Sequence, residues 1–86
     1  MRHRPPPASR DGATLLRRAY GLTAAEARLA LALDRGGTLV EIAARLGVSY
    51  ETVRAQLKAA FTKTGTRKQR DLLALVIKAT SGNLSE

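Results

Sequence analysis

The side chains in this sequence that can take part in chemistry are mostly long and basic. Seven of them lie between residues 45 and 70, where Glu51 is the one acid: Arg45, Arg54, Lys58, Lys63, Arg67, Lys68 and Arg70. Such groups neutralise phosphates, and Arg and Lys also donate hydrogen bonds to guanine edges. The formal charge of +8 on 86 residues indicates the same kind of partner, a polyanion.

Residues for catalysis or metal binding are not grouped in the sequence. The carboxylates are scattered, cysteine is absent, and the single histidine is His3, close to the N-terminus. We therefore expect neither an enzyme nor a metal or other cofactor. The two tyrosines and one phenylalanine are few for stacking bases, which disfavours RNA and single-stranded DNA as partners.

No stretch of the sequence predicts a membrane segment or a secretory signal. The longest strongly apolar run covers residues 72–77, far short of the length that spans a bilayer. The absence of cysteine fits a reducing compartment, so the cytoplasm is the expected location, with no membrane partner.

A predicted helix over about 50–64 carries the best candidates for reading DNA. Its buried stripe is expected to be Val53, Leu57, Ala60, Phe61 and Thr64, at steps of three and four residues. The opposite face then holds Tyr50, Glu51, Arg54, Ala55, Lys58 and Thr62. Long donors can reach base edges while a small residue permits close approach, so we expect base contacts from Arg54, Ala55, Lys58, Tyr50 and Glu51.

The preceding residues are suited to presenting that helix. Ile42 and Leu46 share one face of a short helix, and the small Ala43 lets a second helix cross closely. Gly47 accepts the positive φ that commonly ends a helix, and Ser49 is a good N-cap for the next one. This pattern predicts a helix-turn-helix, although an ordinary α-hairpin in a small bundle has the same spacing.

Phosphate contacts are predicted at helix starts and around the turn that follows residue 64. The helix starts at Thr38 and Ser49 direct amide donors and a favourable dipole toward an anion. Thr52 and Gln56, two polar residues of the predicted helix over about 50–64, are further candidates. The full set is Thr38, Ser49, Thr52, Gln56, Lys63, Arg67 and Lys68.

Three capping boxes mark helix boundaries in the rest of the chain: Thr23 to Glu26, Thr38 to Glu41, and Thr66 to Gln69. The sequence predicts an all-α fold, a small helical bundle with a four-helix module and an N-terminal lead-in helix at about 11–20. The last helix is expected over about 68–80. Residues 1–10 are predicted to be a disordered basic, Pro-rich arm, 11–80 the domain, and 81–86 a flexible tail.

The motifs resemble those of the LuxR/NarL-type (GerE-like) DNA-binding domain of bacterial transcription regulators. The similar stretches are Leu22-Thr23-x-x-Glu26, Glu41-Ile42-Ala43-x-x-Leu46-Gly47-Val48-Ser49-x-x-Thr52-Val53-Arg54, and Lys63-x-Gly65. The resemblance implies that the helix after Ser49 enters the major groove and that Arg54, Ala55 and Lys58 contact bases. It also implies a homodimer through the last helix, by way of Leu72, Leu73 and Ile77. Gln56 stands where a backbone-contacting histidine is common.

The sequence thus predicts sequence-specific binding of double-stranded DNA by a dimeric transcription regulator, with RNA polymerase or a regulatory protein in trans as a further partner. Two alternatives remain open. One is a sigma-factor-like promoter-reading module, which uses a similar helix-turn-helix. The other is a protein-interaction adaptor that keeps the fold but has lost DNA binding.

Overall fold

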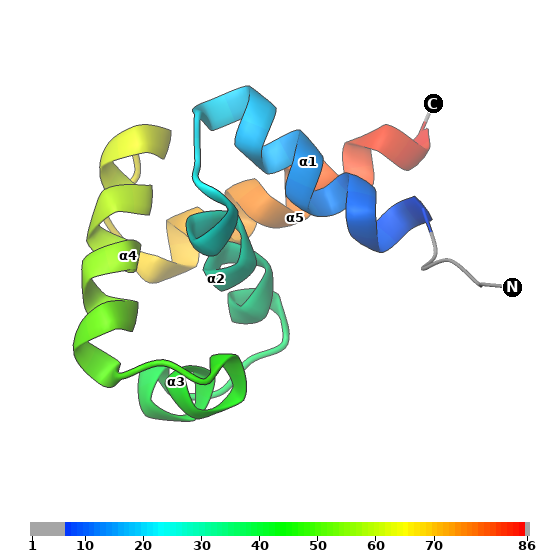
Figure 1. Cartoon of the computed structure of the whole chain (residues 1–86). Coiled ribbons are helices and arrows are strands. Elements are labelled where there is room, and N and C mark those ends of the chain that lie inside the picture. Colours follow the sequence, from blue (N-terminus) through cyan, green and yellow to red (C-terminus); the bar gives the residue numbers. More distant parts are fainter. Residues whose placement is uncertain (1–6, 86) are drawn as a thin grey trace, which may run out of the picture.

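The computed structural model describes the backbone of residues 7–85 and the side chains of residues 12–80. Within these residues it contains five helices and no strand, which confirms the all-α prediction (Figure 1). The helices are α1 (Pro7–Tyr20), α2 (Ala24–Asp34), α3 (Leu39–Leu46), α4 (Tyr50–Thr64) and α5 (Gln69–Ser85). None of these helices is both long enough and apolar enough to cross a membrane.

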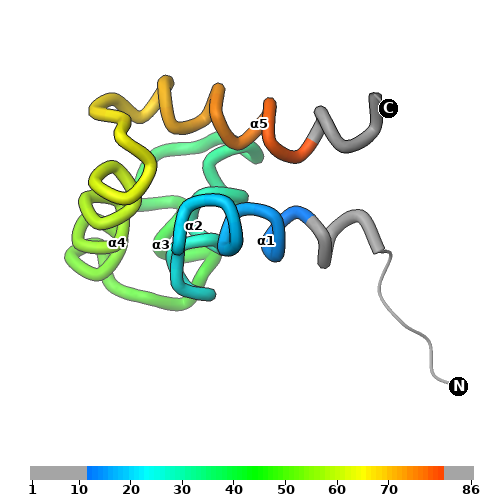
Figure 2. Tube along the Cα trace, turned by 90° about the horizontal axis from the view of Figure 1, so that it is seen from above, coloured from blue at the N-terminus to red at the C-terminus, as the bar shows by residue number. Residues whose placement is uncertain are grey.

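The helix α2 lies at the centre of the bundle and packs on each of the other four helices. Helix α4 lies at one end of the molecule, while α1 and α5 pack on each other and extend away from it (Figures 1 and 2). Every helix contributes to one core, whose largest fully buried side chains are Leu16, Leu29, Ile42, Val53, Leu72 and Val76. The bundle therefore holds α4 on one side only and leaves its other side to solvent.

Helix α1 packs closely on its neighbours at Gly12, although a Cβ would fit there. A Cβ at this position would lie 3.5 Å from both Leu31 Cδ2 and Thr80 Cγ2, which is ordinary van der Waals contact. The backbone of α1 thus lies directly against side chains of α2 and α5.

Two of the three predicted capping boxes form as expected. At the start of α2, Glu26 N–H donates to Thr23 Oγ1 at 3.1 Å, and Thr23 N–H donates to Glu26 Oε1 at 3.0 Å. The start of α3 repeats this pattern between Thr38 and Glu41, at 3.1 and 2.9 Å. Each box satisfies backbone donors that the helix itself cannot, which fixes where α2 and α3 begin.

The third capping box, predicted at Thr66 to Gln69, does not form. Helix α5 begins at Gln69, and its first bond runs from Leu72 N–H to Lys68 O at 3.0 Å. Thr66 still belongs to the end of α4, because its N–H donates to Phe61 O at 3.0 Å. Its hydroxyl pairs with the hydroxyl of Thr64 at 2.8 Å instead of capping α5.

The two outer helices are longer than the sequence predicted. Helix α1 begins at Pro7, so residues 7–10 are helical where an arm was expected, and α5 continues to Ser85 through the predicted tail. Proline is well tolerated in a first helical turn, and no proline interrupts residues 81–85. The remaining parts of the predicted arm and tail, residues 1–6 and Glu86, lie outside the described residues.

Candidate nucleic-acid interface

The turn between α3 and α4 has the geometry that the sequence predicted. Gly47 adopts φ +73°, and Val48 N–H donates back to Ala43 O at 3.0 Å. Ser49 then caps α4, since its Oγ accepts from Thr52 N–H at 3.1 Å. Val48 packs half-buried against the core, which anchors the turn. These contacts fix the position at which α4 leaves the bundle.

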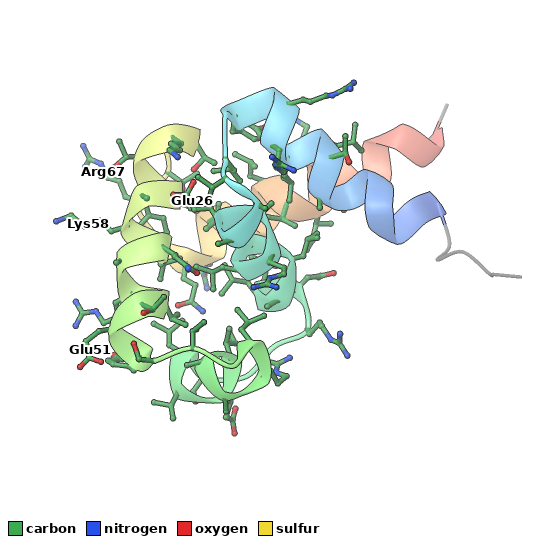
Figure 3. The ribbon with its side chains drawn as sticks, in the orientation of Figure 1. Glu26, Glu51, Lys58 and Arg67 are labelled. Atoms are coloured by element: carbon green, nitrogen blue, oxygen red, sulfur yellow. The ribbon has the colours of Figure 1, made fainter. Side chains whose placement is uncertain are left out.

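Helix α4 is buried along one stripe and exposed along the other. Val53, Leu57 and Ala60 lie in the core, as predicted, with Phe61 and Thr64 half-buried beside them. Five predicted base-contact residues are all exposed, and we call them the outer face of α4: Tyr50, Glu51, Arg54, Ala55 and Lys58. In Figure 3, Glu51 and Lys58 project from the outer side of α4, and Arg67 projects in the same direction from the following loop.

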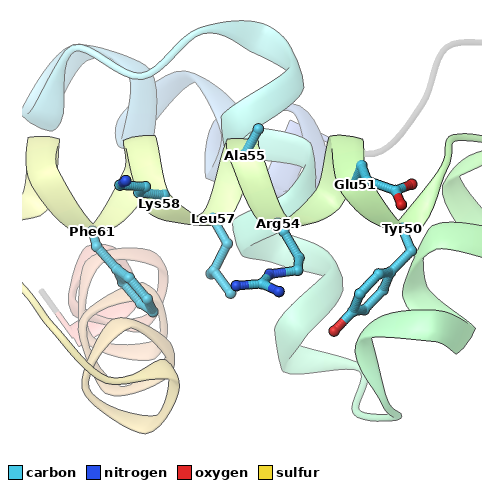
Figure 4. A pocket seen from close by; sticks show the side chains of 7 residues that line it. All are labelled: Tyr50, Glu51, Arg54, Ala55, Leu57, Lys58 and Phe61. Atoms are coloured by element: carbon cyan, nitrogen blue, oxygen red, sulfur yellow. The ribbon is translucent and has the colours of Figure 1, made fainter.

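The outer face is hollowed rather than flat. Its five residues, together with Leu57 and Phe61, line a shallow open depression of about 620 Å³ (Figure 4). Leu57, Phe61 and Ala55 contribute apolar groups to its lining, and Arg54 and Lys58 contribute cationic donors. Because the depression is open along the helix, it suits an extended partner better than an enclosed small molecule.

The cations of the outer face are available for a ligand. Among the side chains that the structure describes, the one ion pair joins Lys63 to Glu26, so neither Arg54 nor Lys58 has a carboxylate partner. The guanidinium carbon of Arg54 instead lies 5.9 Å from the centre of the Tyr50 ring, a cation–π contact.

Lys63 has a structural partner that the sequence did not indicate. Its Nζ donates to Glu26 Oε1 at 2.7 Å, which joins the end of α4 to the start of α2. The hydrogen bond from Lys63, followed by the backbone hydrogen bond from Thr23, lowers the pKa of Glu26 even though burial opposes this. Lys63 was predicted as a phosphate contact. The 37 residues that separate it from Glu26 gave no local signal of this pairing.

The other predicted phosphate contacts differ in what surrounds them. At the start of α3, the Glu41 carboxylate accepts the hydrogen bond of the Thr38 N–H. The negative charge of this carboxylate disfavours a phosphate at the same helix start. The start of α4 has no such box, because Thr52 stands where α2 and α3 have glutamates, and the Ser49 and Thr52 hydroxyls bond each other at 2.9 Å. Gln56 is half-buried, and the remaining two candidates, Arg67 and Lys68, are exposed before α5.

A comparison with protein families gives a match that agrees with this geometry. The family model described as sigma-70, region 4 matches residues 15–63, which is 49 of the 86 residues. The chain belongs to the sigma-70 region 4 family. No curated protein and no solved structure gives a match. As a member of the region 4 family, the chain is a DNA-binding helix-turn-helix module, and the matched segment ends within α4, one residue before its last.

Membership of the region 4 family corrects the predicted LuxR/NarL-type resemblance. The motif residues behind that resemblance, such as Ala43, Gly47 and Ser49, are those that any helix-turn-helix needs for its crossing, turn and cap. They therefore identify the shared motif and not the family. The region 4 match also begins in α1, at Leu15, which the LuxR/NarL interpretation left out of its similarity.

The predicted homodimer came from the same resemblance and loses its basis with it. One of its three proposed contact residues, Leu72, is fully buried in the core and cannot meet a second copy. Leu73 is half-buried, and only Ile77, which is 44% exposed, lies open on α5 as predicted. The apolar run of α5 thus serves mainly to cover α1 and α2.

Proposed function

We propose that this chain binds double-stranded promoter DNA sequence-specifically, as a sigma-factor-like module that works with RNA polymerase. The observation that supports the proposal most strongly is the outer face of α4. There, two cations that have no carboxylate partner among the described side chains lie near a small residue, on a helix that a helix-turn-helix presents to solvent. Membership of the region 4 family supports the choice of promoter DNA as ligand. The proposal describes a binding module and not an enzyme, and it places that module in the cytoplasm.

In this proposal, three residues of the outer face act in the major groove, and Arg67 acts on the DNA backbone. Arg54 donates to a guanine edge, and Lys58 donates to a base or phosphate one turn further along α4. Ala55 lets the helix backbone come close to the base pairs. Arg67, exposed beside α4, neutralises a phosphate, and affinity comes mainly from the release of counterions.

Selection of binding sites from random duplex DNA tests this proposal directly. We expect one consensus, and mobility shifts at two salt concentrations should give complexes that weaken steeply as salt rises. Arg54→Ala should cost about 1–3 kcal/mol on the consensus and relax specificity at one base pair. An equal loss on consensus and random duplexes would instead assign Arg54 to a phosphate.

The same experiment separates the proposed function from an adaptor role. A chain that had lost DNA binding would enrich no sequence and give no salt-dependent complex. Addition of purified RNA polymerase core enzyme to a labelled consensus duplex then tests the protein partner. We expect the polymerase to join the complex with wild-type protein, and a complex unchanged by polymerase would refute that part of the proposal.

A further inference from the structure

We propose that Tyr50 positions the Arg54 guanidinium for a single base edge, and thus sets sequence discrimination without itself contacting a base. This inference rests on the proposed function and deepens it. Tyr50 was predicted from the sequence as a base contact, so the inference gives it a different task on the same face.

The geometry that supports this role is a cation–π contact between two side chains one turn apart. Tyr50 and Arg54 are four residues apart on α4, and their side chains lie on the same side of the helix (Figure 4). The Arg54 Cζ lies 5.9 Å from the centre of the Tyr50 ring. Tyr50 is the first residue of α4 and follows directly on the Ser49 cap, whose hydrogen bonds to Thr52 hold this turn of backbone.

A cation–π contact uses none of the N–H donors of a guanidinium, because the attraction is to the π-system of the ring. Arg54 can therefore stay beside Tyr50 while two of its N–H groups donate to guanine O6 and N7. A guanidinium whose range of directions is already narrowed loses less conformational entropy when it binds, and this favours the one base that its direction fits.

No competing partner draws Arg54 away from the ring. Glu51 lies three residues before Arg54 on the same outer face, yet it forms no ion pair with it in the part of the chain that the structure describes. Lys58, the other cation of this face, has no ring beneath its ammonium among the described side chains. Of the two cations on the outer face, Arg54 therefore has a ring beside it that favours some directions of its guanidinium before DNA arrives, and Lys58 has none among the described side chains.

The test uses duplexes that carry the selected consensus and a version changed at the one base pair that Arg54→Ala identifies. The measured quantity is discrimination, defined as the Kd for the changed duplex divided by the Kd for the consensus duplex. Tyr50→Leu removes the ring but keeps an apolar residue, and it should lower this ratio by about two- to fivefold at that base pair alone. Tyr50→Phe keeps the ring and serves as the matched control, with a ratio equal to wild type. Circular dichroism melting checks that both variants are folded.

A double-mutant cycle with Arg54→Ala decides between positioning and direct contact. In that background, Tyr50→Leu should no longer change the ratio, because no guanidinium remains to be positioned. The inference would be overturned by an undiminished effect in that background, by an equal loss of affinity on all duplexes, or by Tyr50→Phe behaving as Tyr50→Leu. Failure of wild-type protein to select a consensus would refute the proposed function itself, whereas a consensus with no effect of Tyr50→Leu would refute this inference alone.

Discussion

Replacing Glu26 by glutamine isolates the charge that links the start of α2 to the end of α4. Glutamine can still close the capping box with Thr23, so the backbone donors stay satisfied and only the charge is lost. Glu41→Gln is the matched control. It makes the same chemical change in the capping box at the start of α3, where Glu41 is exposed and has no lysine partner among the described residues.

The expected loss for Glu26→Gln lies near the upper end of the values for exposed ion pairs. A hydrogen bond to a charged group contributes about 1.5–3 kcal/mol, while exposed ion pairs contribute about 0.2–1 kcal/mol. The side chain of Glu26 is 10% exposed, but that of Lys63 is 34% exposed, so solvent screens the pair in part. We expect a loss of about 1 kcal/mol, or about 4–8 °C in Tm for a domain of this size. Glu41→Gln should stay within about 0.5 kcal/mol.

The pH dependence provides a second signature of the same carboxylate. The pKa of Glu26 is lower in the folded chain than its ordinary value of 4.5, so folding favours the charged form. Its contribution is therefore present in full above the unfolded pKa and is lost as the pH falls through the folded pKa. The difference in stability between wild type and Glu26→Gln should be constant near neutral pH and should shrink once the pH falls below 4.5.

Urea unfolding followed by circular dichroism, at neutral pH and at several acidic values, measures both effects. Equal losses for Glu26→Gln and Glu41→Gln at neutral pH would refute the view that the ion pair stabilises the fold. A difference between wild type and Glu26→Gln that persists unchanged in acid would refute the assignment to a titrating carboxylate.

Three further predictions concern the outer face of α4, the turn before it and the core. Lys58→Gln should reduce the magnitude of the slope of log K against log salt by about 0.9, which is the contribution of one phosphate contact. Lys63→Gln should reduce it less, because the Lys63 ammonium already has a carboxylate partner. Gly47→Ala should cost about 1–2 kcal/mol in urea unfolding through its positive φ alone, since a Cβ there would touch nothing. Leu72→Ala should cost about 2–5 kcal/mol, whereas Ile77→Ala should cost under about 1 kcal/mol and leave the sedimentation coefficient unchanged.

Each of these predictions has an outcome that contradicts it. Equal salt slopes for the Lys58 and Lys63 variants would mean that the ion pair with Glu26 opens when DNA binds. A neutral Gly47→Ala would show that the turn relaxes away from its left-handed conformation. A faster-sedimenting wild type that Ile77→Ala converts to a slower species would restore the dimer through α5.

Local chemistry explains why much of the fold could be predicted from the sequence. The starts of α2 and α3 follow from capping boxes whose partners are three residues apart. The end of α3 follows from Gly47, because glycine is one of the few residue types that adopt a left-handed conformation at low cost. The exposure of the outer face of α4 follows from helical periodicity. All of these signals lie within a few residues of the feature that they predict.

The features that the sequence did not predict depend on residues far apart in the chain or on apolar positions that the sequence cannot tell apart. The Glu26–Lys63 pair joins two helices, so no local pattern contains it. In α5, the apolar run 72–77 covers adjacent faces of one helix, and only the positions of α1 and α2 decide that Leu72 is buried while Ile77 is exposed. The third capping box failed because Thr66 was already bonded to the end of α4.

The pairing of α1 with α5 determines which contacts a pulling force on the ends of the two helices would break first. The two helices lie antiparallel, and they extend away from α4 (Figure 1). A tether attached at either outer end would therefore approach from the side opposite the outer face of α4. Tension between the two ends would separate α1 from α5 one turn at a time, a peeling geometry in which few contacts resist at once. Helices α3 and α4 would carry load last, so the module would yield at its ends while α4 still held its place.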